Sequence, residues 1–238
     1  MNERDLPLGI HHVTAMTSDV VKNYEFFTEV LGMRLVKKTV NQDDIHTYHT
    51  YYGDDTGSPG TAMTFFDFPN NPKGIKGTNA ITRTSFRVPN DASLEYYQER
   101  FAKFDVKHEA ITTEFGKKVL RFWDFDEQAY QLISDENNVG MKPGTPWKKG
   151  PVPEKFAIYG LGPVEITVSY FNDFKEIFEE LLSFEEIAQE GNRYLLEVGE
   201  KGNGAQVVLI EDATQNIAQQ GYGEVHHFAL RLKDAASI

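Results

Sequence analysis

Two short stretches far apart in the chain share a pattern that strongly constrains the fold. Each begins with two consecutive histidines, continues with alternating apolar and polar residues, and reaches an aspartate seven positions after the second histidine. They occupy residues 10–19 and 225–234 and hold four of the seven histidines. Such alternation predicts a half-buried strand, and the aspartate predicts a helix N-cap. We therefore expect related modules that open with the same strand.

The four histidines are the main candidates for functional residues. Successive side chains of a strand face opposite sides, so His12 shares a face with Thr14, while His11 turns the other way. If the two modules pack together, His12 and His227 point into one cavity. A lone strand histidine is more often structural than a ligand, but its recurrence at one position of distant repeats favours ligation. His11 and His226 reach the cavity only if their strands start irregularly.

The opening strand introduces units of similar length along the chain. In each unit a helix with apolar residues at helical spacing follows, and then three more strands. The units occupy residues 8–70, 79–137 and 156–213, and a fourth begins at 222 and continues to the end of the chain at 238. The second and third units open without a histidine. The sequence thus predicts an α+β fold of tandem βαβββ modules.

Two details within the later modules are specific enough to test. In the second module, strands are expected at residues 106–111, 119–123 and 130–134. In the third, Asp173 is the expected helix cap. His49, in a tyrosine-rich strand of the first module, is interpreted as a packing residue of the core or of the site wall.

Residues 141–155 interrupt the modular pattern. Four prolines, two glycines and several lysines in this stretch favour an extended linker and oppose a helix or central strand. We place a domain boundary there, with residues 8–140 before it and 156–238 after it. The fourth module lacks on the order of 50 residues relative to a full repeat, so it is expected to be truncated or completed by another chain.

Charge and composition exclude several functional classes. The net charge of −12 over 238 residues disfavours nucleic acids and anionic membranes as partners. The absence of cysteine excludes disulfides, thiolate nucleophiles and cysteine-based zinc sites. No apolar run approaches the length that spans a bilayer, and the first residues lack the features of a signal peptide. We expect a cytoplasmic protein.

The repeated βαβββ unit resembles the module of the vicinal oxygen chelate superfamily, which includes glyoxalases, bleomycin-resistance proteins and extradiol ring-cleaving dioxygenases. Within it, the chain is similar to a subgroup of ring-cleaving, hydroquinone-specific dioxygenases over its whole length. The segments that carry this resemblance are Gly9–Thr14, Leu31–Asn41, Tyr48–Asp54 and Gly57–Thr61. It implies two glyoxalase-like half-barrel domains, the second with an incomplete fourth module.

The resemblance also implies a metal centre. In the subgroup, Fe(II) is bound by one histidine from the first module, one from the fourth, and a glutamate from the last strand of the fourth. The histidines correspond to His12 and His227, and the glutamate would lie beyond the end of this chain. Mn(II) and Zn(II) are the alternative ions. Two imidazoles and a carboxylate leave three positions of an octahedral ion for substrate and O2. His11, Thr14 and His226 are implied to line the site.

The implied activity is cleavage of a hydroquinone or catechol ring beside a hydroxylated carbon, with O2 as co-substrate. Metal binding lowers the pKa of the phenol, and His11 or His226 acts as base. Without the carboxylate, we expect weaker Fe(II) binding and an inactive chain as one outcome. The alternatives are a glyoxalase-like lyase or isomerase and a binder of aromatic compounds. The resemblance to this superfamily also suggests that the protein forms a homodimer. Gln131, at the place of a ligand in single-barrel relatives, is interpreted as structural.

Overall fold

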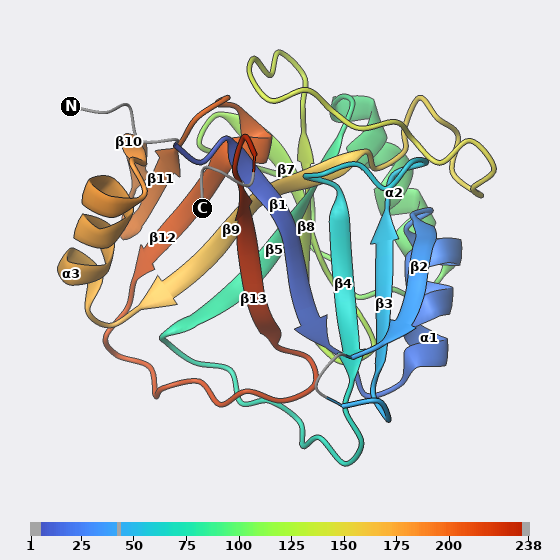
Figure 1. Ribbon diagram of the computed structural model, residues 1–238. Helices are drawn as coiled ribbons and strands as arrows, with labels where there is room; N and C mark the ends of the chain where they lie inside the picture. The colour runs from blue at the N-terminus through green and yellow to red at the C-terminus, as the bar shows by residue number, and fades with distance from the viewer. Residues whose placement is uncertain (1–5, 42–43, 235–238) are drawn as a thin grey trace.

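The computed structural model describes residues 6–41 and 44–234, and its α+β architecture agrees with the predicted fold class. Three runs of strand, helix and three strands follow one another, and one further strand comes after them (Figure 1). The first run comprises β1 (Gly9–Met16), α1 (Val20–Glu25), the π-helical turn η1 (Phe26–Val30), β2 (Arg34–Val40), β3 (Tyr48–Gly53) and β4 (Ala62–Asp67).

The other two runs repeat this order. The second comprises β5 (Ala80–Val88), α2 (Asp91–Lys103), β6 (Thr112–Glu114), β7 (Lys117–Trp123) and β8 (Ala129–Ser134). The third comprises β9 (Gly160–Val168), α3 (Phe171–Glu176), η2 (Ile177–Leu181), β10 (Glu185–Glu190), β11 (Arg193–Glu197), η3 (Asn203–Ala205) and β12 (Gln206–Glu211). The last strand is β13 (Val225–Arg231). The predicted continuation after Asp234 lies outside the described residues.

Local side chains explain where the helices begin. Asp19 accepts hydrogen bonds from the first backbone N–H groups of α1, as the sequence predicts. The cap predicted at Asp173 is wrong, because α3 begins at Phe171, where the ring is buried and lies 4.3 Å from that of Tyr194. Burial of this ring in the first turn outweighs the missing side-chain cap.

The strand predicted at residues 106–111 is also wrong. That segment makes one isolated bridge, from His108 to Phe122, and β6 follows at residues 112–114. A tight turn at Phe115 and Gly116, both with positive φ, sets this register by pairing residues 112–114 directly with β7.

The strands form two sheets that cut across the predicted division between residues 8–140 and 156–238. The five-stranded sheet has the order β13-β1-β4-β3-β2, and the eight-stranded sheet has the order β10-β11-β12-β9-β5-β8-β7-β6. In Figure 1, β13 accordingly lies against β1, far from its sequence neighbours in β12. In each sheet the opening strands of two modules pair antiparallel, β1 with the edge strand β13 in the five-stranded sheet and β5 with β9 at the centre of the eight-stranded sheet.

An aromatic core joins the two sheets. The ring of Phe27, in η1, is stacked 4.8 Å from Tyr52 and lies 4.9 Å from Phe65, both in the five-stranded sheet. The same ring contacts Phe86 and Tyr130 of the eight-stranded sheet. All five side chains are buried. Such contacts combine apolar burial with favourable ring geometry, so the sheets are held in one fixed arrangement.

The predicted linker at residues 141–155 contains no helix or strand, but it is packed against the fold. Met141 and Val152 are buried, and the backbone N–H of Thr145 donates to Asp54 at 2.8 Å. Val152 also lies directly against Gly32, whose left-handed φ of +74° and missing side chain permit the close approach. The segment therefore contributes to the core.

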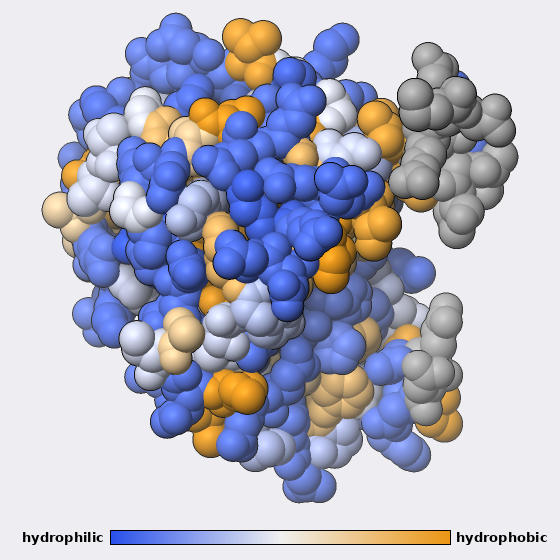
Figure 2. Space-filling model, turned by 90° about the vertical axis from the view of Figure 1, so that its left-hand side faces the viewer, coloured by the Kyte–Doolittle hydropathy of each residue, from blue (hydrophilic) through white to orange (hydrophobic). Residues whose placement is uncertain are grey.

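The surface view in Figure 2 is mainly hydrophilic, with hydrophobic residues in small separate groups. Scattered exposed apolar residues of this kind are normal for a folded domain. None of the helices within the described ranges has the length and hydropathy needed to cross a bilayer.

Candidate metal centre

The pairing of β1 with the edge strand β13 in the five-stranded sheet brings His12 and His227 together. Antiparallel pairing of β1 and β13 places Thr14 opposite His227. The Nε2 atoms of His12 and His227 are 3.3 Å apart, although 215 positions separate the residues in sequence. The two imidazoles thus meet on one face of the sheet, as the repeated pattern predicts.

The strand pairing is irregular at the other two histidines. The register of β1 against β13 skips His11 between Ile10 and His12, and it skips His226 between Val225 and His227. These are β-bulges, which re-aim side chains and occur often beside active sites. Because of them, His11 and His226 lie on the same side as their neighbours instead of turning away.

The four rings form a chain of contacts. Nδ1 of His11 is 2.9 Å from Nδ1 of His12, and Nδ1 of His226 is 2.8 Å from Nδ1 of His227. In each neighbouring pair, one nitrogen donates its hydrogen and the other accepts it. Each central ring is therefore held at Nδ1 by its neighbour and presents Nε2 toward the other central ring.

This arrangement fits a metal ion. Nitrogen ligands lie about 2.1 Å from a bound ion, so two adjacent ligands are on the order of 3 Å apart, close to the separation observed between His12 and His227. Metal-binding histidines also typically hydrogen-bond through their second nitrogen, which fixes the tautomer. The bonds to His11 and His226 provide this.

Burial keeps the central imidazoles neutral. It lowers the pKa of His12 to about 4, with further contributions from the nearby rings of His11, His227 and His49. Burial likewise lowers the pKa of His49 to about 4, helped by His227 and by the positive charge of Lys37. At neutral pH these rings are unprotonated at one nitrogen, which is the form that binds metal ions.

A third ligand is not found in the part of the chain that the structure describes, where no group of three or more histidine, cysteine or acidic side chains is placed to hold an ion. His49 approaches the pair but is engaged elsewhere, with Nε2 3.0 Å from the hydroxyl of Thr64 and Nδ1 2.8 Å from that of Tyr51. The site thus consists of two converging imidazoles with hydrogen-bonded neighbours.

A row of polar side chains continues from the histidines across the sheet. Thr14 is buried, with its hydroxyl 2.8 Å from that of Thr64, which in turn contacts His49. Thr64 and Tyr51 were missed in the sequence analysis, and His49 was left between core and site wall. The signal that could place them is the register: Thr14 faces Thr64, and Thr64 faces Tyr51.

A cavity of about 340 Å³ adjoins this row. His49, Tyr51 and Phe66 form part of its wall, and Lys37 lies at its side with the ammonium 5.3 Å from the Tyr51 ring centre. The Phe66 ring is 4.3 Å from that of His49 and 5.8 Å from that of His226. The cavity therefore combines flat apolar walls with hydrogen-bonding groups beside the histidines.

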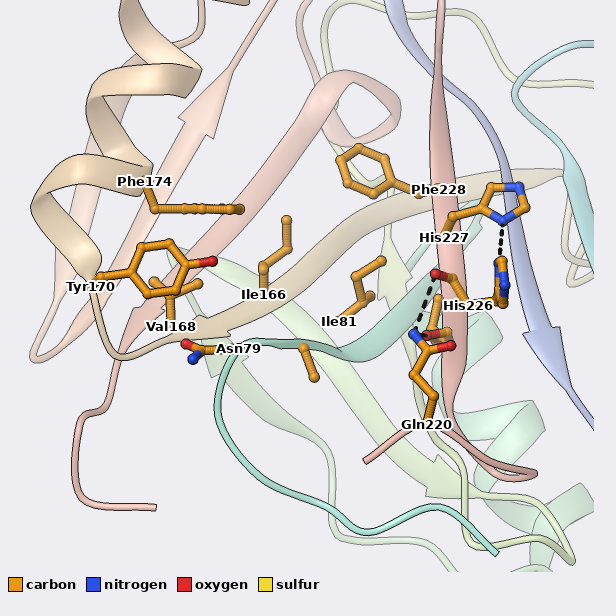
Figure 3. A pocket seen from close by; sticks show the side chains of 12 residues that line it. Asn79, Ile81, Ile166, Val168, Tyr170, Phe174, Gln220, His226, His227 and Phe228 are labelled. Carbon is orange, nitrogen blue, oxygen red and sulfur yellow. Dashed lines mark hydrogen bonds between the residues drawn. The ribbon is translucent and has the colours of Figure 1, made fainter. Parts of the chain in front are cut away.

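A different depression, of about 330 Å³, lies between β13 and α3 (Figure 3). The rings of His226 and His227, joined by a hydrogen bond, lie at one edge of it, and Phe228 faces its interior. Its far wall includes Ile166 and Phe174. This side of β13 offers mainly apolar surface and no further candidate ligands.

Comparison with known proteins identifies the family. Residues 9–132 match the model of the "Glyoxalase/Bleomycin resistance protein/Dioxygenase superfamily". The chain belongs to this superfamily. It is 42% identical over 235 residues to the "Putative ring-cleaving dioxygenase MhqA" of Bacillus subtilis (strain 168), covering 97% of this chain and 74% of that protein. This agrees with the subgroup resemblance of the sequence analysis.

Other members of the superfamily extend the comparison. The "Chlorohydroquinone/hydroquinone 1,2-dioxygenase" of Sphingobium indicum is 27% identical, with 95% of this chain and 71% of that protein covered. A crystal structure of a dioxygenase described as putative, from Bacillus subtilis subsp. subtilis str. 168, matches with a TM-score of 0.88 and 29% identity, over 98% of this chain and 73% of that chain. Glyoxalase I from Zea mays, at 15% identity and a TM-score of 0.69 over 96% and 76% of the two chains, shares the fold.

Proposed function

We propose that this protein is a metal-dependent ring-cleaving dioxygenase that opens hydroquinone- or catechol-type rings with O2. The observation that carries the proposal is the meeting of His12 and His227, each held at Nδ1 by a second imidazole. Relatives named as ring-cleaving dioxygenases, one of them acting on hydroquinones, support the reaction class.

In the proposed reaction, the carbon–carbon bond beside a hydroxylated ring carbon breaks. The aromatic ring supplies the electrons that reduce O2, and both oxygen atoms enter the ring-opened product. A metal ion, for which Fe(II) is proposed, would be held by His12 and His227, where it would lower the pKa of the substrate hydroxyl and bring substrate and O2 together. Extradiol-type cleavage is part of the proposal.

The neighbouring imidazoles would orient the ligands and act on substrate protons. When His12 and His227 use Nε2 for an ion, their hydrogens lie on Nδ1 and are donated to His11 and His226. The outer rings then carry hydrogen on Nε2, from which they can donate to a substrate oxygen. In their proposed acid–base role, His11 and His226 therefore first donate a hydrogen bond from Nε2 to the substrate.

The cavity beside His49 provides a place for the substrate ring. Phe66 and Tyr51 offer apolar ring surfaces in its wall, and the imidazole of His49 and the hydroxyl of Tyr51 offer hydrogen-bonding groups. The positive charge of Lys37 beside the Tyr51 ring would favour a phenolate over a neutral phenol.

An oxygen-electrode assay tests the proposal. Protein loaded with Fe(II) under anaerobic conditions is mixed with hydroquinone and air-saturated buffer. We expect one O2 consumed for each ring opened, with the product followed by mass spectrometry using labelled O2. The variant His227→Ala should lose both iron and turnover. Iron and turnover retained at the wild-type level in this variant would contradict the assignment of the ligand.

The same assay separates the alternatives of the sequence analysis. A glyoxalase-like lyase or isomerase would convert a thiohemiacetal substrate without consuming O2. A binder of aromatic compounds would retain its affinity for hydroquinone after complete removal of metal and would show no turnover. Either result, obtained with protein whose bound iron has been measured, would overturn the proposed reaction.

A further inference from the structure

The eight-stranded sheet places a different cluster where the five-stranded sheet has its histidines. Arg83 lies seven residues before the N-cap Asn90, as His12 lies seven before Asp19. Its partner across the central strand pair is Glu165, with Nε and Oε2 3.2 Å apart. At the position of His12, the eight-stranded sheet thus has an arginine that is ion-paired across the strand pair to the counterpart of Ala229.

This ion pair is one part of a connected network. Glu165 also binds Arg193, and Glu114 binds both Arg193, at 2.8 Å, and Arg121, at 2.6 Å. We call the side of the sheet that carries these five residues the arginine face. Guanidinium groups remain charged at every physiological pH, so the arginine face is closed to metal ions at the position of His12.

A cavity of about 260 Å³ lies on the arginine face beside this network. Its walls are mainly aliphatic, from both modules of the sheet, and comprise Val119, Ile133, Ile187, Ala188, Leu195 and Val208. An engineered cavity of about 150 Å³ with such a lining is known to hold benzene, so this volume accommodates a six-membered ring with substituents.

Two amide oxygens in the cavity wall lack hydrogen-bond donors. Gln131 and Asn203 are only 3% and 1% exposed, and neither Oε1 of Gln131 nor Oδ1 of Asn203 has a partner within the described residues. The orientation of Asn203 is fixed, because its Nδ2 donates to Asp135 at 2.7 Å. Buried polar atoms are usually satisfied, so two acceptors on one cavity indicate a ligand that donates hydrogen bonds.

The charged residues of the wall narrow the chemistry of that ligand. Glu114 is neutralised by its two arginines, whereas Lys117 has no ion pair within the described ranges. A nearby ammonium group repels a cationic donor such as an amine. Neutral donors such as hydroxyl or amide groups are therefore favoured over cationic ones, and a hydroxyl on a flat apolar ring is a neutral donor that also matches the aliphatic walls.

From these observations we propose that the arginine face holds a second, metal-free binding site for a single-ring phenol, with Gln131 accepting its hydroxyl hydrogen and Asn203 available to a second hydroxyl on the ring. This assignment replaces the structural interpretation of Gln131. It is independent of the histidine centre, because it requires neither metal, O2 nor turnover, and its failure would leave the proposed dioxygenase reaction untouched.

A binding experiment on the metal-free protein tests the site. The chelator-treated chain is titrated with 4-fluorophenol, observed by fluorine NMR, while methyl resonances of Val119, Ile133 and Leu195 report the location. We expect these methyl groups to shift and 4-fluorotoluene, which lacks the hydroxyl, to bind about tenfold more weakly, as the loss of one hydrogen bond to a buried acceptor predicts.

Two variants complete the experiment. Gln131→Met, similar in size but without the acceptor, should bring the affinities of the two probes together. Ala188→Phe, on the partly exposed edge strand β10, should fill the cavity and abolish the shifts even if the first variant folds poorly. Shifts confined to threonine methyls around His12, equal affinity of both probes for the unaltered protein, or no binding would overturn the proposal and leave water as the partner of the two amides.

Discussion

The two sheets share the same pairing of opening strands, but the side chains that these strands carry differ in charge. We call the side of the five-stranded sheet that carries the four histidines and Thr14 the histidine face. There, the paired opening strands present neutral imidazoles whose Nε2 atoms are 3.3 Å apart, where we propose that a cation binds. On the arginine face, the equivalent strand pair, β5 with β9, carries a cationic side chain, because Arg83 lies against Glu165.

The comparison separates the backbone features that both sheets share from the side chains that differ between them. The skip in register before His12 recurs before Arg83, where Thr82 takes the position of His11. The bulge is thus common to both sheets, and the side chain placed in it decides the function. The two charges of a buried ion pair compensate each other, whereas the nitrogen lone pairs of two neutral imidazoles can be used to bind an added ion.

The largest expected effect comes from removing a central histidine. His12→Gln should abolish metal retention and turnover, because even the hydrogen-bond partners of ligands typically contribute about 10- to 100-fold. Elemental analysis and O2 uptake measure the two losses. A control variant in the eight-stranded sheet, Thr82→Val at the position that corresponds to His11, should retain both. Equal losses in the two variants would remove the distinction between the faces.

Next in size is the loss of stability expected from the arginine face. Glu165→Gln removes a buried carboxylate and leaves the partly buried Arg83 and Arg193 with one fewer anionic partner, which should lower the free energy of unfolding by about 3–5 kcal/mol. Urea denaturation measures this change. Metal affinity should be unaffected once the fraction of folded protein is taken into account. A change below about 1 kcal/mol would mean that the network is dispensable.

A smaller effect is expected from the rings in the bulges. His11→Phe keeps an aromatic ring but removes the nitrogen that holds His12, and should weaken metal binding by about 10- to 100-fold. Competition with a fluorescent chelator gives the affinity. His46→Phe changes a histidine in the β2–β3 connection and should leave the affinity unchanged. An unaltered affinity in His11→Phe would show that the contact between the two rings does not orient the ligand.

The smallest expected effect is the contribution of the histidine face to the pH dependence of stability. The pKa of His12 and of His49 is about 4 in the folded protein, below the ordinary value of 6.5. At these two residues the unfolded chain binds more protons between the two values, so their contribution to metal-free stability should be complete above pH 6.5 and fall as the pH drops toward 4, while buried Asp124, whose pKa is raised to about 7, acts in the opposite direction. Urea midpoints measured along this range test the sign. The variant His49→Gln should flatten the profile, and a profile identical to that of the unaltered protein would contradict the assignment.

Several of these structural features can be predicted from the sequence, because they depend on residues that are close together in the chain. The strand around His12 and the helix cap at Asp19 depend on neighbouring residues, and both are found as predicted, whereas the strict alternation is interrupted by the bulge at His11. The recurrence of the pattern near His227 also suggested the meeting of the two strands. Local periodicity failed where tertiary packing decides, as at Phe171, whose buried ring moves the start of α3.

The remaining features depend on register between distant strands. The sheets join residues from opposite ends of the chain, so a boundary drawn at the proline-rich segment could not reveal which modules share a sheet. The roles of Thr64 and Tyr51 likewise follow from their positions opposite Thr14 across two strand pairs. The ion pair of Arg83 with Glu165 has no sequence signature at all, because 82 positions separate its members.

The shared bulge has a consequence for redesign. Since the backbone irregularity is present beneath both Thr82 and His11, it does not require imidazoles to form. The eight-stranded sheet is therefore a ready scaffold into which the histidine arrangement can be transplanted at residues 82 and 83, with the opposing position on β9 adjusted to match. One polypeptide would then carry two ion-binding centres built on the same local backbone geometry.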